Sequence, residues 1–577
     1  MIKILVIFYI SFFLLVPAAI SQPKYCLKAI DKQTSKEIDQ KYNKSFNTAS
    51  ARDKEIYNIK NSFSDGGFLS FSVDSIAQDS TCKTIFINKG LSYQWVKIKT
   101  GQIDENILKK SGFNENQFNN KKISIKDLRD LKLSIIKICE NNGYPFAEIK
   151  LDSIVIADNL VEASLILNKN NLILIDSIVM KGNSETKVSF LYNYLGIKKG
   201  GIYDESLVKK IDKKINDLSF LKIKKPTSIV FFEDRCKLLI TAEKIKASNF
   251  DGILGIIPDN LTGNIVLTGD VKLRLVNSFK SAETIELNWK RLIGNSQKLF
   301  LYINYPYMLS TSFGVDYSID LLQKDTTYIS VKQNGGIKYM FDGFDYVNFF
   351  GDFYNSNLLS TVNFEALNVL PDYADVNTVL FGMGFYKEAY DFRLNPRNGY
   401  LINMSIAAGN KTITQNPKIK KVLYDSITLK SEQYKYDLHA NIFFNPYKRN
   451  VLMFGVNAGK MFNENLFQNE LYRLGGAKLL RGFDEESIFA SFYSVFTFEY
   501  RYLIDRLSFI SVFWDGAYYE NRSINRHIID RPYGVGAGFT FETKQGVFSI
   551  SYALGKQFDN PVQFKSGKIH LGYINYF

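Results

Sequence analysis

The spacing of apolar residues changes near residue 246, and this change divides the chain into two parts. In residues 23–245, segments in which every second residue is apolar alternate with segments in which apolar residues recur three and four positions apart. The second spacing is that of one helix face, and it is clearest at Leu207, Ile211, Ile215 and Leu218. After residue 246 the helical spacing disappears. The pattern predicts small mixed α+β domains followed by a long all-β region.

The first part repeats one order of elements three times. Residues 172–244 have the order strand, helix, helix, strand, strand, and the stretch before them has the same order. A less regular copy begins at Tyr25. Generic small α+β domains are the alternative to a true tandem repeat. We expect domains at residues 22–91, 92–170 and 171–245.

The second part, residues 246–577, reads as about sixteen amphipathic strands. In "YKYDLHANIFF" one face carries Tyr434, Tyr436, Leu438, Ala440 and Ile442, and the other carries Lys435, Asp437, His439 and Asn441. Such alternation suits a wall between lipid and a water-filled lumen. A soluble β-sandwich also alternates, but the abundance of Phe and Tyr favours the aromatic girdles of a membrane barrel. The sequence predicts a transmembrane antiparallel β-barrel.

The first residues indicate export from the cytoplasm. Lys3 precedes a continuous apolar run, and Ala19-Ile20-Ser21 offers small residues for cleavage, so residues 1–21 read as a signal peptide. An uncleaved anchor helix is the alternative. No later apolar run approaches the roughly 20 residues of a transmembrane helix. A membrane-spanning region of this chain must therefore be a closed barrel, which satisfies its own backbone hydrogen bonds in lipid.

The charge, cysteine and histidine content limits which binding partners and which chemistry the chain is expected to have. The net charge is +14, and the excess of basic residues is +10 in residues 23–245 against +3 in residues 246–577. This indicates either a solvated lysine-rich face or attraction to anionic lipid head groups, and export argues against nucleic acid. Cys26 and Cys82 form a disulfide or remain separate thiols, alternatives that spacing leaves open. With three histidines and no metal-ligand spacing, we expect no metal, no cofactor and no enzymatic activity.

The loop between the eleventh and twelfth predicted strands has an unusual, half-apolar sequence. "YRLGGAKLLRGFDEES" contains Gly475, Gly476, Leu480, Arg481, Gly482 and Phe483. The repeats resemble POTRA domains. Together with a sixteen-stranded barrel and the Arg-Gly-aromatic motif, they resemble the BamA/TamA family of outer-membrane proteins. Three POTRA-like repeats resemble TamA in domain number.

The resemblance implies that this loop folds into the barrel lumen and that Arg481 pairs there with an acidic residue. Phe513 and Asp515 match the family's Phe-x-Asp pattern on the thirteenth strand, and Glu499 on the twelfth strand is the second candidate partner. The chain departs from the family at Ala517, which occupies a position usually held by glycine. A solvent-exposed Arg481 is the alternative.

Two further stretches match the family pattern. Gly572 and Phe577, in the last strand, match the signal by which outer-membrane barrels are recognised for insertion, although Asn575 stands where an aromatic residue is common. In "RLNPRNGYLINMS" a Pro-x-x-Gly turn ends at Gly399 and precedes a strand.

The resemblance implies an outer-membrane assembly, insertion or translocation factor whose N-terminal domains lie in the periplasm. The first strand, residues 249–257, and the last, residues 568–577, would separate laterally and accept a strand of an incoming protein by β-augmentation. The implied partners are unfolded outer-membrane or secreted proteins, outer-membrane lipid, and periplasmic or inner-membrane accessory proteins. The alternatives are a two-partner secretion exporter of one dedicated substrate, a passive porin and a membrane-embedded hydrolase.

Overall fold

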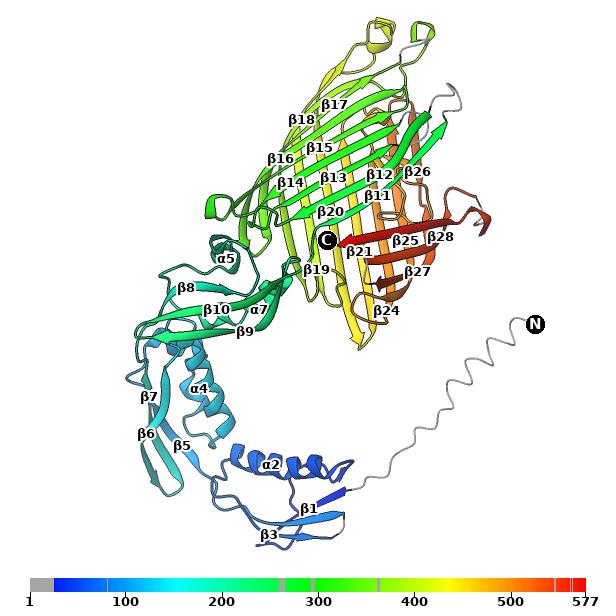
Figure 1. The fold of residues 1–577 in the computed structure, drawn as a ribbon. Helices are drawn as coiled ribbons and strands as arrows, with labels where there is room; N and C mark the ends of the chain where they lie inside the picture. The colour runs from blue at the N-terminus through cyan, green and yellow to red at the C-terminus, as the bar shows by residue number, and fades with distance from the viewer. Residues whose placement is uncertain are drawn as a thin grey trace, which may run out of the picture. The chain divides into compact units, whose positions relative to one another are not determined.

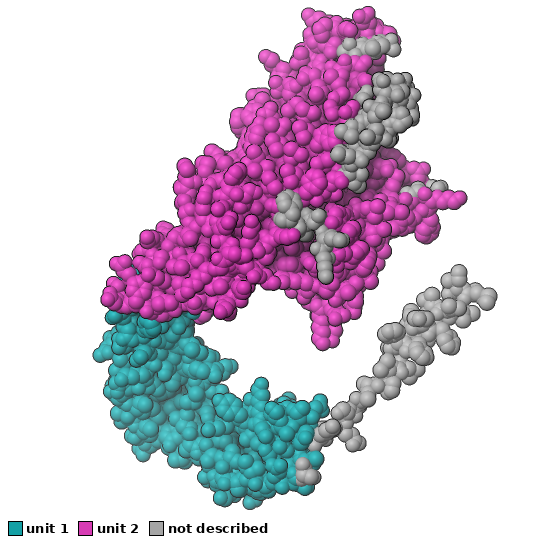
Figure 2. Space-filling view, viewed as in Figure 1, with its two compact units in different colours: residues 1–174, 202–206 teal, residues 175–201, 207–577 magenta. Residues whose placement is uncertain are grey.

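The computed structural model describes residues 25–79, 81–258, 265–291, 296–360, 364–543, 546–560, 562 and 564–576. The predicted signal peptide and Phe577 lie outside these residues. The chain forms two compact units, one of residues up to 174 with 202–206, the other of residues 175–201 and 207–577 (Figure 2).

The first domain is a four-stranded sheet packed against one helix. Its elements are β1 (Tyr25–Asp31), β2 (Ser45–Phe46), α2 (Ala49–Asp65), β3 (Ser72–Gln78) and β4 (Cys82–Asn88), and the sheet order is β2-β1-β4-β3. Thr48 caps α2 by accepting a hydrogen bond from the Ala51 backbone N–H. Cys26 and Cys82 are register partners in the parallel pair β1–β4, and they form a disulfide. The structure thus selects one of the two alternatives left open by the cysteine spacing.

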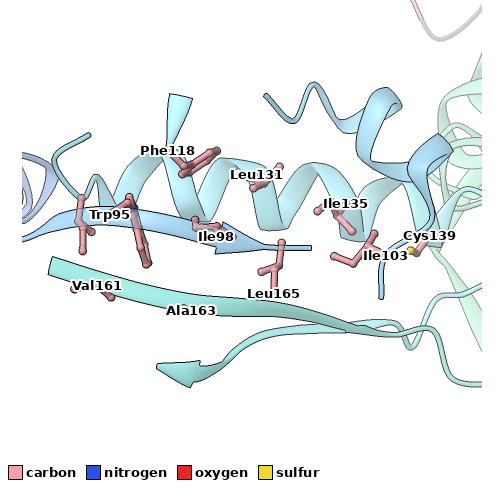
Figure 3. Close-up of a cluster of buried hydrophobic side chains, with 11 residues drawn as sticks. Trp95, Ile98, Ile103, Phe118, Leu131, Ile135, Cys139, Val161, Ala163 and Leu165 are labelled. Carbon is pink, nitrogen blue, oxygen red and sulfur yellow. The ribbon is translucent and has the colours of Figure 1, made fainter. Parts of the chain in front are cut away.

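The second domain has the full predicted order of elements. These are β5 (Gln94–Lys99), α3 (Glu105–Ser111), the 3-10 turn η1 (Glu115–Gln117), α4 (Ile125–Glu140), β6 (Glu148–Ala157) and β7 (Leu160–Asn168). The order in the sheet is β5-β7-β6, and β5 runs parallel to β7. Figure 3 shows Leu131 and Ile135 of α4 on the side of the helix that faces the sheet residues Ile98 and Leu165. The apolar residues of α4 that are spaced four positions apart, Leu131, Ile135 and Cys139, are therefore buried against the sheet.

The third domain repeats the order β8 (Leu174–Lys181), α5 (Val188–Leu195), α6 (Glu205–Val208), α7 (Ile211–Asp217), β9 (Leu221–Phe232) and β10 (Arg235–Lys244), with sheet order β8-β10-β9. Its helix α5 contacts turns of the barrel in the same compact unit. The Phe190 ring lies 5.7 Å from that of Tyr307, and the Lys187 N–H donates to the Lys280 carbonyl at 2.8 Å. In α7, Lys214 pairs with Asp342 at 2.6 Å. The third domain is therefore anchored to the barrel by both apolar and charged contacts.

The all-β region forms a near-closed antiparallel barrel of sixteen strands within the described residues, which confirms the predicted fold class (Figure 1). The strands are β11 (Asn249–Pro258), β12 (Ile265–Val276), β13 (Thr284–Arg291), β14 (Gln297–Tyr305), β15 (Phe313–Lys324), β16 (Tyr328–Asp342), β17 (Asp345–Leu358), β18 (Asp375–Tyr390), β19 (Gly399–Thr414), β20 (Lys430–Tyr447), β21 (Asn450–Phe462), β24 (Phe492–Leu503), β25 (Phe509–Ser523), β27 (Tyr533–Thr543), β28 (Gly546–Lys556) and β29 (Lys568–Tyr576). A short strand, β26 (Arg526–Asp530), extends the hairpin after β25. We call the end where β11 begins the near end, and the opposite end the far end.

The two faces of the barrel strands follow the alternation in the sequence. On β20, Tyr436 and Ile442 are exposed on the outer surface, whereas Lys435 points into the lumen and pairs there with Asp352. On β25, Trp514 is 44% exposed and its neighbour Asp515 is 1% exposed. No helix among the described residues has the length and hydropathy of a membrane span.

The ladder between the first and last strands is short. Among the described residues, β11 and β29 share two register pairs, Asn249 with Tyr576 and Phe250 with Asn575. On its other side β11 pairs with β12 along its whole length, from Asn249 to Pro258. We call the β11–β29 junction the seam.

Candidate functional site

Residues 463–491, between β21 and β24, form the longest far-end connection within the described residues, and we call them the inner loop. The loop contains a 3-10 turn, η5 (Gln468–Glu470), and a small hairpin of β22 (Tyr472–Leu474) and β23 (Ile488–Ala490). The tip of this hairpin carries the residues from Gly475 to Phe483 that the sequence singled out.

The inner loop lies inside the barrel because its side chains pack on lumen-facing residues. Leu480 is fully buried, and Phe483 is 8% exposed. Both belong to an apolar cluster that includes Val495 of β24 and Ala517 of β25. The half-apolar composition of the loop is therefore explained by burial against the inner wall.

The Arg481 side chain is held by two carboxylates. Its Nε and Nη2 donate to the two carboxylate oxygens of Asp515, each at 2.7 Å, and its Nη1 donates to Glu499 Oε2 at 2.6 Å. Its backbone N–H also donates to Asp515 at 3.1 Å. Paired donation to one carboxylate is the strongest geometry that a guanidinium offers. The structure thus brings Arg481 together with both candidate partners at once.

The aromatic residue of the predicted pattern completes this arrangement. The Arg481 guanidinium carbon lies 3.5 Å from the centre of the Phe513 ring, which places the cation over the ring face. Phe513, Asp515 and Ala517 point into the lumen from alternate positions of β25. Ala517 is 8% exposed and packs within the apolar cluster beneath the loop. The departure from glycine at this position is accommodated by this packing.

Two glycines allow close backbone packing, one against the barrel wall and one within the loop. Gly482 has φ +94°, and a Cβ there would lie 2.8 Å from the Gly555 backbone nitrogen of β28. Gly475 has φ +108°, and its Cβ would meet the Asp484 carbonyl at 2.3 Å. Side chains other than hydrogen would strain both positions. The glycines of the motif therefore serve close backbone packing.

Sequence reasoning missed a continuation of this polar network. Arg501 Nε donates to Glu499 Oε1 at 2.6 Å, and its Nη1 donates to Asn395 Oδ1 at 3.2 Å. Asn395 lies in the near-end Pro-x-x-Gly turn that the sequence identified only as a turn. Arg501 could have been found, because residues two apart on a strand share a face and Glu499 was already a candidate.

The seam residues have less constrained surroundings. Gly572 lies in β29 opposite Ser549, and an added Cβ would come no closer than 3.7 Å to it. Phe577 lies outside the described residues. The inner loop reaches the last strand through Asp484, which pairs with Lys568 at 2.7 Å.

The site is held together by ion pairs and by close packing of the backbone. Among the described residues no group of His, Cys, Asp and Glu is placed to hold a metal ion. Arg481 and Arg501 balance Asp515 and Glu499, so the buried network carries no net charge. Such an arrangement positions a loop and needs no exchange of protons or groups.

Comparisons with known proteins agree with this architecture. Residues 296–569 match the Omp85 superfamily domain. CdiB from Escherichia coli has a similar structure at 12% identity and a TM-score of 0.54, with 92% of this chain and 98% of that chain covered. CdiB from Acinetobacter baumannii gives 13% identity and a TM-score of 0.51, with 91% and 98% covered.

A third solved structure is BamA from Haemophilus ducreyi lacking POTRA domains 1-3, at 15% identity and a TM-score of 0.44, with 84% of this chain and 100% of that chain covered. No curated protein matches this chain. At identities this low, the similarity to the two CdiB structures shows a shared fold alone. Residues 296–569, which include the inner loop and most of the barrel strands, match this family model, so this chain carries an Omp85 superfamily domain.

Proposed function

We propose that this protein inserts or translocates other proteins at the bacterial outer membrane, with its N-terminal domains in the periplasm. Omp85 proteins are bacterial outer-membrane barrels that act in insertion or transport and are not enzymes. The three small α+β domains ahead of the barrel, with the strand and helix order of POTRA domains, support this proposal.

The observation that carries the proposal is the short ladder at the seam. The two register pairs between β11 and β29 lie at the near end, at Asn249 and Phe250. Beyond them β11 continues to Pro258, and β12 pairs with it throughout. A strand edge with few partners is a template on which another chain can add a strand.

The proposed mechanism is lateral opening of the seam followed by strand addition. Unfolded outer-membrane or secreted proteins would pair with the edge of β11 and leave into the surrounding lipid. The edge strands of the N-terminal sheets, such as β6 and β9, would receive the same chains or accessory proteins earlier. No covalent step is required, because backbone hydrogen bonds exchange one partner for another.

The Arg481 network would position the inner loop during this opening. The loop is fixed to β24 and β25 by Arg481, and the ion pair that joins it to β29 within the described residues is that of Asp484 and Lys568. Lys568 is 38% exposed in its side chain and Asp484 is 72% exposed, so this pair is weak. The loop could therefore keep its place on β24 and β25 while the last strand moves.

A second candidate function is export of one dedicated partner protein through the barrel. The fold similarity to two CdiB structures is the reason to test this second function. The number of N-terminal domains argues for the insertase, since this chain has three such domains and two-partner secretion pores typically carry two. Depletion in the native host, followed by outer-membrane proteomics, separates the two functions.

Loss of many barrel proteins from the outer membrane is the outcome expected for an insertase. Loss of one secreted protein with normal barrel proteins would support the exporter and contradict the insertase. An unchanged proteome, with reduced uptake of small solutes, would instead indicate a passive porin.

A further inference from the structure

A cavity of about 300 Å³ lies inside the barrel, apart from the Arg481 network. Its floor is formed by lumen-facing side chains of β14–β18 and β20–β21, and its roof by residues 469–473 and Glu486 of the inner loop. We call it the lumenal chamber. Its volume would hold roughly ten water molecules or a ligand at the small end of the usual range.

The chamber has polar atoms without partners. Five lining residues each have a side-chain atom that makes no hydrogen bond within the described part of the chain, namely Asp320, Asp352, Thr378, Gln433 and Glu470. Four of these side chains belong to residues that are at most 8% exposed. Buried polar groups nearly always have partners in folded proteins. Their gathering around one cavity indicates that the cavity is occupied when the protein functions.

The orphaned atoms define what the occupant must offer. Those of Asp320, Asp352, Gln433 and Glu470 are carboxylate or amide oxygens, which accept hydrogen bonds. The Thr378 hydroxyl can accept or donate. A ligand that fits these positions must therefore present several donors.

The charges of the chamber argue for a neutral ligand. Lys332 and Lys435 share Asp352, at 3.5 and 3.3 Å. Counting all lining residues, four basic side chains face four acidic ones, namely Lys298, Lys332, Lys435 and Arg473 against Asp320, Asp352, Glu470 and Glu486. An ion of either sign would meet as many like charges as opposite ones. Hydroxyl groups suit both kinds of neighbour, because each can donate to a carboxylate and accept from an ammonium.

Apolar surface accompanies these polar groups. Leu322, Leu380 and the Tyr354 ring line the chamber beside Thr378. Ligand pockets typically combine apolar and aromatic walls with a few placed polar groups. A ring whose edges carry hydroxyls and whose face carries C–H groups matches this combination.

We propose that the lumenal chamber binds a small, neutral, polyhydroxylated molecule of monosaccharide size. The proposal goes beyond protein insertion or transport and does not depend on it. The site would be saturated from solution by a sugar or cyclic polyol, and its occupancy would hold the inner loop against β14–β18 and β20–β21.

The test is saturation-transfer difference NMR on the full chain in neutral-lipid nanodiscs. The probes are D-glucose, D-galactose and myo-inositol, with glycine betaine, a zwitterion, and acetate, an anion, as charged comparisons. We expect transfer to the ring protons of at least one polyol and none to betaine. Gln433→Leu or Thr378→Val should raise the dissociation constant about tenfold, since each removes one hydrogen bond in a buried site.

Gln333→Leu is the matched control, because Gln333 is exposed on the opposite face of the wall, and it should bind the polyol as the wild type does. Circular dichroism and heat-dependent gel mobility verify that each variant folds. If no saturation is transferred to any of the three polyols, the chamber holds only water and the proposal is wrong. Transfer that survives both chamber substitutions would place binding elsewhere, and a preference for betaine or acetate would refute the charge argument.

Discussion

The seam and the wall on the opposite part of the sheet are built from the same kind of strand but are joined very differently. β18 and β19 are paired along their whole length, from Asp375 with Thr414 to Tyr390 with Gly399, whereas β11 and β29 share two register pairs. Each backbone hydrogen bond contributes a modest net free energy, so the resistance to separation grows with ladder length. One barrel can therefore be rigid on one side and ready to open on the other.

The rigid side also carries packed far-end loops. Residues 364–374, 415–429 and 463–470 share an apolar cluster that includes Leu370, Ile419 and Phe467, and we call these loops the far-end cap. Beneath the cap, Lys411 is fully buried and paired with Glu470. Cap and long strands stabilise each other, while the described residues of the seam carry no comparable cluster. The contrast shows that the position of the opening depends on where the cap and long strands reinforce the barrel as well as on where the ladder is short.

The largest effect is expected from closing the seam covalently. Cysteines at Phe250 and Asn575, which are register partners, should form a disulfide and abolish protein assembly in a folded barrel. Reduction should restore activity. Non-reducing gels and an assembly assay measure both.

The matched control places cysteines at Phe381 and Ala408, register partners on β18 and β19. This second crosslink should leave activity unchanged, because the long ladder does not need to open. Equal activity of the oxidised seam variant and the wild type would contradict lateral opening.

The next effect is expected from Arg481→Ala. The substitution leaves two carboxylates in the lumen, of which Asp515 loses both hydrogen bonds from the Arg481 side chain. The backbone N–H at this position can still donate to Asp515. Breaking a buried pair costs roughly 3–5 kcal/mol in a dry site, and a wet lumen should reduce this. The penalty should displace the inner loop and impair activity while the barrel remains folded.

Double-mutant cycles sharpen this result. Asp515→Ala should resemble Arg481→Ala, and the double variant should be no worse than either, as expected for a shared interaction. Glu499→Ala should be milder for the loop, because Asp515 still binds Arg481. Protease accessibility of the loop is the measurement. Fully additive defects would show that the two residues do not act as a pair.

A smaller effect on activity is expected from weakening the far-end cap. Lys411→Met leaves Glu470 buried without its cation, which should loosen the cap by roughly 3–5 kcal/mol. Lys411→Met with Glu470→Leu should recover most of that stability, since apolar replacements for buried pairs are often neutral. Hydrogen exchange of residues 415–429 checks both. Activity should fall little, because the cap lies on the long-strand side, and a loss as large as that of the seam crosslink would contradict the comparison.

The smallest effect is expected from Asp217 in α7, near the anchored junction of the third domain and barrel. Burial raises the pKa of its carboxyl from 3.8 to about 6. Because the pKa of Asp217 is higher in the folded state than in the unfolded state, its protonated form favours folding. This contribution to the free energy of unfolding is fully present below pH 3.8 and is lost as the pH rises through about 6. Asp217→Asn should flatten stability between pH 4 and 7 and add up to about 1 kcal/mol at pH 7.5, a value reduced for partial exposure. Hydrogen exchange of α7 against pH measures this; an unchanged slope would refute it.

The sequence by itself determined the order of elements and the faces of the strands. Alternation is a local property, so the two faces predicted for residues 434–442 are the faces observed on β20. The motif around Arg481, and the two acidic candidates for pairing with it, were also readable from residue types.

Only the tertiary structure decided how distant segments meet. It showed that Arg481 binds Asp515 and Glu499 together, that Arg501 extends the network to Asn395, and that Cys26 joins Cys82. It also revealed the seam with its two register pairs, and the lumenal chamber, whose lining residues come from seven barrel strands and the inner loop. These features depend on register around a closed sheet and on how a loop packs inside it. Both are set by contacts between residues far apart in the chain, which no local periodicity records.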